Sequence, residues 1–78
     1  MERRIVERKD YGEVQIILSK VLKSKGITVN KLATLVDSRY DTVKSYVDNN
    51  IQRTDLDLLA RICYALDCKL QDIIEYKK

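Results

Sequence analysis

Apolar residues recur at helical spacing in two short neighbouring segments near the middle of the chain. From Thr28 onward they lie at positions i, i+3 and i+4, which predicts a helix over residues 28–36 with one buried face. The pattern stops at Asp37, where short polar residues suit a turn. It resumes over residues 39–48, whose buried stripe would consist of Val43, Tyr46 and Val47. The pattern therefore predicts a helix-turn-helix.

The outer face of helix 39–48 is polar. Its outward residues are Tyr40, Asp41, Lys44 and Ser45. A narrow buried stripe beside side chains that donate and accept hydrogen bonds is typical of a helix that enters the major groove of DNA. Contact with DNA through this face is the function that the pattern favours.

Three further helices are predicted around this pair. Residues 13–25 follow an amphipathic pattern that ends at Gly26, a residue that suits the left-handed position after a helix. Residues 54–67 begin with capping side chains and carry a broad apolar face, and residues 70–75 predict a short fifth helix. We therefore expect an all-α, five-helix domain over residues 13–78.

Residues 1–12 form an N-terminal arm with no clear periodicity. Charged residues surround the few apolar ones there, which are Ile5, Val6 and Tyr11. A frayed arm, a short edge strand and an early helical turn all remain open for this segment.

Length and composition limit the class of protein. A chain of 78 residues with 45% hydrophobic and 35% charged residues is one small globular domain. No proline and only two glycines favour helices with tight connections. No apolar run approaches the roughly 18 residues of a membrane span, and the charged N-terminus lacks the apolar core of a secretory signal. We expect a cytoplasmic protein that does not enter the membrane.

The net charge of +3 is unevenly distributed. Residues 20–53 hold seven Lys or Arg against three Asp, whereas residues 54–78 hold four basic residues against five acidic ones. The positive excess therefore falls on the part of the chain that contains the predicted helix-turn-helix, where DNA phosphates would be met. An ordinary solvated helical surface explains the charge alone equally well.

The chain lacks the usual signs of catalysis. It has no histidine, no glycine-rich phosphate loop, no nucleophile motif and no set of metal ligands, so we predict no enzyme activity, no cofactor and no metal. Cys63 and Cys68 are five positions apart, which is not the C-x-x-C spacing of a redox pair. We expect both to be reduced, buried and inert thiols.

Two runs of the sequence carry a family resemblance: GITVNKLATL…DTVKSYVDNN and DLDLLARICYALDCKLQDIIEY. Together they resemble the small Cro/phage-repressor-like (Xre-type) helix-turn-helix regulators of bacteria and phages, over residues 14–76. The ordered set that carries the resemblance is Leu32-Ala33, Thr42-Val43, Leu59, Ile62, Ala65-Leu66 and Asp72-Ile73-Ile74. It implies a lambda-repressor-like domain of five helices that binds double-stranded operator DNA, usually as a homodimer, through its third helix.

The resemblance also implies which side chains contact DNA. The candidates for contact with base edges are Arg39, Tyr40, Asp41 and Ser45. The candidates for contact with the sugar-phosphate backbone are Thr28, Lys44, Asn50, Gln52 and Arg53. Five of these residues have an ordinary alternative: Arg39 pairs with Asp41 or Asp37, Tyr40 leans on the turn, Asp41 stabilises the helix dipole, and Lys44 and Arg53 are solubilising charges.

Several positions depart from the family pattern. Val29 stands where many members place a phosphate-binding glutamine, and Asp37 and Asn49 replace two usual glycines. Asp48 adds a negative charge near the backbone contacts. A second hypothesis, in which the chain is a protein-interaction module such as an antitoxin or adaptor, is favoured by Val29 and by the acidic residues Asp37, Asp41 and Asp48 beside the presumed groove face.

A small core also favours self-association. A domain of this size buries only about 60% of its unfolded surface. A homodimer that buries Leu58, Tyr64 or parts of the last two helices would add stability, and it would contact two half-sites about 34 Å apart.

Overall fold

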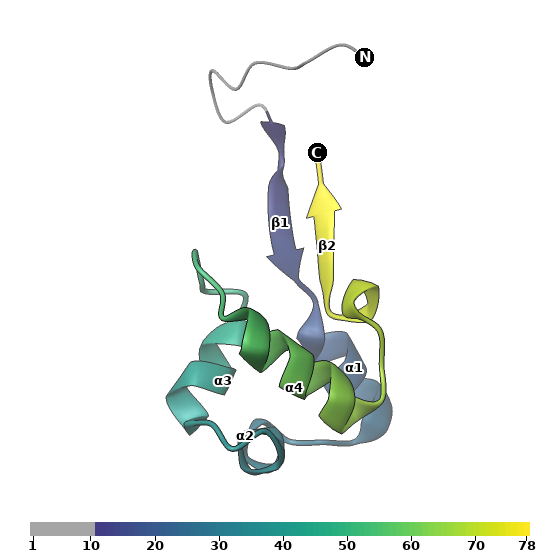
Figure 1. Ribbon diagram of the computed structural model, residues 1–78. Coiled ribbons are helices and arrows are strands. Elements are labelled where there is room, and N and C mark those ends of the chain that lie inside the picture. The colour runs from purple at the N-terminus through teal and green to yellow at the C-terminus, as the bar shows by residue number, and fades with distance from the viewer. Residues whose placement is uncertain (1–10) are drawn as a thin grey trace.

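The computed structural model describes residues 11–78 as four α-helices and one two-stranded antiparallel sheet. The elements in chain order are β1 (Glu13–Ile16), α1 (Leu18–Lys25), α2 (Val29–Leu35), α3 (Tyr40–Val47), α4 (Leu56–Leu66), the 3-10 helix η2 (Leu70–Asp72) and β2 (Ile74–Lys77). The helices pack together, and the sheet projects from them with the C-terminus at its far end (Figure 1). No helix among these residues is long and apolar enough to cross a membrane.

The predicted all-α fold of five helices is wrong at both ends of the domain. The first four residues of the predicted helix 13–25 form β1, and the predicted helix 70–75 is a single 3-10 turn followed by β2. The two strands pair in the register Glu13↔Lys77, Val14↔Tyr76, Gln15↔Glu75 and Ile16↔Ile74. Each strand alternates polar and apolar residues over only four positions, and its apolar residues also fit the helical pattern of their neighbours, so the distant partner strand decides the outcome.

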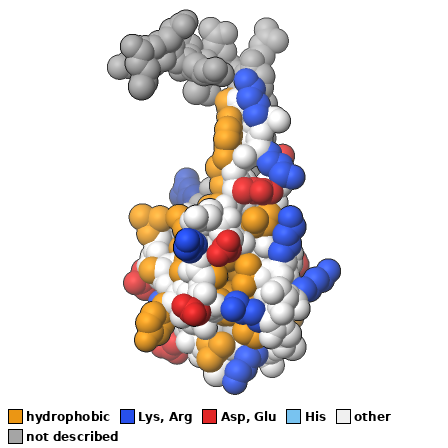
Figure 2. All heavy atoms as spheres, turned by 90° about the vertical axis from the view of Figure 1, so that its right-hand side faces the viewer, with side chains coloured by type: hydrophobic (Ala, Val, Ile, Leu, Met, Phe, Trp, Pro, Cys, Tyr) orange, Lys and Arg blue, Asp and Glu red, His pale blue; other side chains and the backbone are white. Residues whose placement is uncertain are grey.

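The sheet has one apolar and one polar face. The register places Val14, Ile16, Ile74 and Tyr76 on one face and the charged residues on the other. Hydrophobic side chains accordingly run along one side of the projection, and charged ones along the other (Figure 2).

The start of β1 is held against the end of β2. The Tyr76 hydroxyl donates to the Tyr11 carbonyl. Gly12 has a φ of 82° and no room for a Cβ beside the Lys77 carbonyl, so glycine is required where β1 begins. The rest of the predicted arm, residues 1–10, lies outside the described residues.

Every element except η2 contributes to a single hydrophobic core or packs against it. The buried side chains are Ile16, Leu18, Leu22, Leu32, Ala33, Val36, Val43, Tyr46, Leu58, Leu59, Ile62, Leu66 and Ile73. Leu58 is only 2% exposed, so it belongs to the core of one chain, and the prediction that it is a dimer contact is wrong.

Cys63 and Cys68 are free thiols but half-buried, which corrects the prediction of full burial. Burial, aided by the nearby Cys63, raises the pKa of the Cys68 thiol and keeps it protonated.

The four α-helices end in the same way. A residue with positive φ follows the last turn in each case: Gly26 (66°), Asp37 (53°), Asn49 (57°) and Asp67 (50°). The next amide then bonds back to the helix: Ile27 to Leu22, Ser38 to Ala33, Asn50 to Ser45 and Cys68 to Cys63, at 2.9–3.1 Å. Only one of the four is glycine, so three helix ends carry some backbone strain.

We expect Asp67→Gly to stabilise the protein. Asp67 holds a φ of 50° and its side chain makes no hydrogen bond in the described part of the chain. Relief of this strain exceeds the entropy that glycine adds to the unfolded chain, by about 0.5 kcal/mol. Thermal unfolding followed by circular dichroism should show a rise of roughly 2–4 °C in Tm.

Asn49→Gly is the matched control. Its backbone is equally strained, but its Oδ1 accepts the Ile16 N–H at 2.8 Å. Loss of that bond, worth about 1 kcal/mol, should cancel the gain. If Asp67→Gly were as stable as the wild type or less so, strain at this helix end would be negligible.

Candidate nucleic-acid interface

The helix-turn-helix predicted from the sequence is present, with helix ends within one residue of the prediction. The Lys31 N–H donates to Thr28 Oγ1 at 3.1 Å, so Thr28 caps α2 as predicted. The turn that follows α2 contains Val36, which is 2% exposed, and Asp37, whose positive φ reverses the chain. These local features set where α3 begins.

Arg61 on α4 fastens this turn. Its Nη1 donates to the Val36 carbonyl at 2.7 Å and lies 3.4 Å from the Asp37 carbonyl. Its Nε lies 3.0 Å from the Asp57 carboxylate, an ion pair whose alignment falls short of a hydrogen bond. A cation at the C-terminal end of a helix satisfies carbonyls that have no amide partner. Arg61 is not among the residues predicted from the sequence, although a basic residue inside an apolar helix, four positions after an acidic one, is a signal of such a role.

Tyr46 fastens the middle of α3 to the start of α4. Its side chain is 4% exposed, and its hydroxyl accepts the Asp55 N–H at 3.0 Å and lies 2.8 Å from Thr54 Oγ1. A buried tyrosine needs a partner for its hydroxyl, and this one has two. The assignment of Tyr46 to the core is therefore confirmed.

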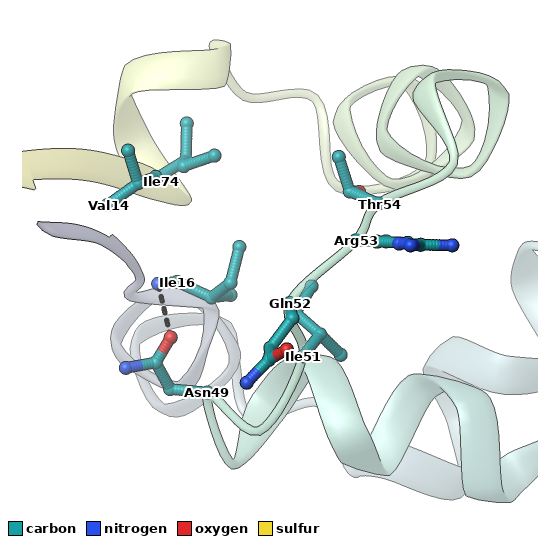
Figure 3. Close-up of a pocket in the computed structure, with 8 residues that line it drawn as sticks. All are labelled: Val14, Ile16, Asn49, Ile51, Gln52, Arg53, Thr54 and Ile74. Carbon is teal, nitrogen blue, oxygen red and sulfur yellow. Dashed lines mark hydrogen bonds between the residues drawn. The ribbon is translucent and has the colours of Figure 1, made fainter. Parts of the chain in front are cut away.

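Asn49 fastens the end of α3 to the sheet. Its Oδ1 accepts the Ile16 N–H at 2.8 Å, which joins two segments far apart in sequence (Figure 3). Beside this bond lies a small open hollow of about 120 Å³ between the sheet and the loop after α3. Its lining residues are Val14, Ile16, Asn49, Ile51, Gln52, Arg53, Thr54 and Ile74. The Arg53 side chain points away from the hollow (Figure 3).

The four base-edge candidates lie on α3 or just before it: Arg39 precedes the helix, Tyr40 and Asp41 begin it, and Ser45 lies one turn after Asp41. Arg39, Tyr40 and Asp41 are exposed, and Ser45 is half-buried. Arg39 forms no ion pair with Asp37 or Asp41, so that ordinary alternative is absent here. The Ser45 hydroxyl donates to the Asp41 carbonyl at 3.0 Å, which leaves its lone pairs as acceptors.

The backbone candidates are spread over three elements. Thr28 is the N-cap of α2, Lys44 lies on α3, and the exposed loop after α3 contains Asn50, Gln52 and Arg53.

Lys44 is engaged within its own helix. Its Nζ lies 2.6 and 2.7 Å from the two carboxylate oxygens of Asp48, one turn later. This hydrogen bond raises the pKa of Lys44. Both side chains are nearly half exposed, so solvent screens the pair. Arg39 and Lys44 are thus balanced by Asp41 and Asp48, and α3 itself carries no excess of positive charge.

Three known families or proteins are similar to this chain. A family model described as the Cro/C1-type HTH DNA-binding domain matches residues 18–78. The SPbeta prophage-derived HTH-type transcriptional regulator YopS of Bacillus subtilis (strain 168), itself uncharacterized, is 28% identical over 65 residues, which cover 81% of this chain and 85% of YopS. The crystal structure of a candidate DNA-binding protein from Bacteroides fragilis superimposes with a TM-score of 0.71 at 22% identity, over 81% of this chain and 100% of that one. The last likeness shows a shared fold.

We expect Arg61→Met to loosen the helix-turn-helix. The variant keeps the length and apolar stem of the side chain but leaves the Val36 carbonyl without its charged donor. Loss of a hydrogen bond to a charged group costs about 1.5–3 kcal/mol. Urea unfolding should show that loss, and hydrogen exchange should accelerate at the amides of Asp37 and Ser38.

Asp57→Asn is the control for the ion pair alone. The Asp57 side chain is 76% exposed, so its removal should cost well under 1 kcal/mol. Equal losses in the two variants would show that the bond to Val36 contributes little to stability.

Proposed function

The chain belongs to the Cro/C1-type HTH DNA-binding domain family, and we propose that it is a sequence-specific transcriptional regulator whose α3 contacts bases in the major groove. The match confirms the Xre-type resemblance seen in the sequence. YopS, which carries the name of a transcriptional regulator, supports the regulatory part of the proposal. The observation that carries it is the fixation of α3: contacts before, within and after the helix hold its polar face outward.

The contacts with bases come from residues 39–45. The exposed Arg39 guanidinium fits the two acceptors of guanine, the commonest specific contact in the major groove. Tyr40, 47% exposed, offers a hydroxyl to phosphate or its ring to a thymine methyl. The Asp41 carboxylate accepts from a cytosine amino group, and the Ser45 hydroxyl accepts from a base donor.

Affinity comes from contacts with phosphates on either side of α3. Thr28 and the loop residues Asn50 and Gln52 supply polar groups, and Arg53 and Lys44 supply charge. Each cation that neutralises a phosphate adds about 0.9 to the slope of affinity against salt. A homodimer would place two copies of α3 on half-sites about 34 Å apart, and the protein would act in the cytoplasm.

Selection from a randomised duplex pool tests this function. We expect an enriched palindrome, bound with a steep salt dependence. Arg39→Ala should weaken binding by 1–3 kcal/mol and relax the preference at one base pair. Fluorescence anisotropy on the enriched duplex and on single-base variants measures both, with Lys78→Ala at the end of the sheet as the control.

A pool without enrichment, together with feeble non-specific binding, would refute the DNA-binding function. The exposed face of α3 would then be the surface on which an antitoxin or adaptor meets a partner protein.

We further expect Asp48→Asn to tighten binding to every duplex alike. The change releases Lys44 from its ion pair and removes a negative charge near the phosphates. Coulomb energies of about 1 kcal/mol at an exposed site correspond to a gain of roughly fivefold, with a salt slope steeper by about one.

Lys44→Ala in the Asp48→Asn background should abolish that gain. If Asp48→Asn left the affinity and salt slope unchanged, Lys44 would not contact the backbone.

A further inference from the structure

Helix α4 carries a second apolar stripe that the fold does not cover. Leu56 is 76% exposed and Tyr64 is 90% exposed, and the exposed Ala60 lies midway between them. The spacing of i, i+4 and i+8 places the three in a line along one side of the helix. The opposite side is already buried in the core through Leu58, Leu59, Ile62 and Leu66.

A shallow hollow lies beside this stripe. Leu35, 47% exposed at the end of α2, faces the stripe across it. The lining residues are Leu35, Ala60, Arg61, Tyr64 and Ala65, and the hollow measures about 370 Å³. It is therefore wide enough to receive a large side chain from outside.

We propose that the stripe of Leu56, Ala60 and Tyr64 is the contact between two copies of this chain, with α4 antiparallel to α4 of the partner. The inference rests on the proposed homodimer and deepens it by assigning the surface. A large side chain lies one turn before Ala60 and another lies one turn after it. Reversal of one helix places Leu56 of each copy against Tyr64 and the hollow of the other. Ala60 then meets its own copy on the two-fold axis, where a small side chain lets helices approach to about 8 Å.

The charges beside the stripe favour the same arrangement. Asp57 and Arg61 lie one turn apart on one flank of α4, with their side chains 76% and 40% exposed. In an antiparallel pair this flank lies against itself in the reverse direction, which brings Asp57 of each copy near Arg61 of the other. A second copy thus matches the stripe both in shape and in charge.

The size of the stripe sets the strength of the contact. Its exposed apolar side chains amount to on the order of 400 Å² per copy, about half of the ~800 Å² that each partner contributes to a standard interface. The dimer is therefore weak in free solution. Two adjacent half-sites on one duplex hold two copies side by side, and the resulting high local concentration favours the dimer.

Disulfide trapping of the full chain tests the geometry. Ala60→Cys in a Cys63→Ser, Cys68→Ser background should cross-link readily under mild oxidation, because a two-fold axis at Ala60 brings the two Cα atoms within the ~4.4–6.8 Å that a disulfide spans. Ser24→Cys on α1 and Val14→Cys on the sheet, in the same background, are exposed controls that should cross-link slowly. Preferential cross-linking through Val14→Cys, or equal slow rates at all three positions, would overturn the inference.

Tyr64→Glu tests the contact without a new cysteine, at a position too exposed to disturb the core. Sedimentation equilibrium should show at least a tenfold weaker self-association than in the wild type. On a duplex with two half-sites the Hill coefficient should fall to 1, while affinity for one half-site stays the same.

The two hypotheses fail separately. Cross-linking of the Ala60→Cys variant, together with a wild-type chain that binds no DNA, refutes the regulator and supports the α4 contact. Cooperative DNA binding that Tyr64→Glu leaves unchanged refutes the α4 contact alone.

Discussion

The hydrogen bond from Arg61 to the Val36 carbonyl fixes the geometry of the helix-turn-helix. Val36 is 2% exposed and ends a helix, so its carbonyl has no amide from a next turn and little access to water. A guanidinium held by Asp57 supplies the missing donor from α4. The direction in which α3 leaves the turn is thus determined by an element that follows it in the chain.

The other attachments of α3 are also polar bonds at the edge of the core. Val43 and Tyr46 bury one side of the helix, but a single buried side leaves a short helix free to slide along its axis. The Tyr46 hydroxyl on Asp55 and the Asn49 amide oxygen on Ile16 prevent that movement, because each needs one alignment. A core of this small size therefore holds a rigid outward face through directional bonds more than through buried area.

The local features of the domain could be predicted from the sequence, and the non-local ones could not. Thr28 as a cap, Asp37 and Asn49 at positive φ, and Tyr46 in the core all follow from neighbouring residues. The strand Glu13–Ile16 depends on Ile74–Lys77, and the partners of Arg61 and Asn49 lie 25 and 33 residues away. The Lys44–Asp48 pair was an exception: its i,i+4 spacing was visible in the sequence and was overlooked.

The pairing of β1 with β2 has a consequence for the order of assembly during protein synthesis. The strands are separated by about sixty residues, so β1 leaves the ribosome several seconds before its partner at roughly 5–20 residues per second. The local contacts of α2 and α3 close first, since short loops cost less entropy than long ones. Until β2 arrives, Val14 and Ile16 present a bare apolar edge, and nascent chains on neighbouring ribosomes are most exposed to mispairing in that interval.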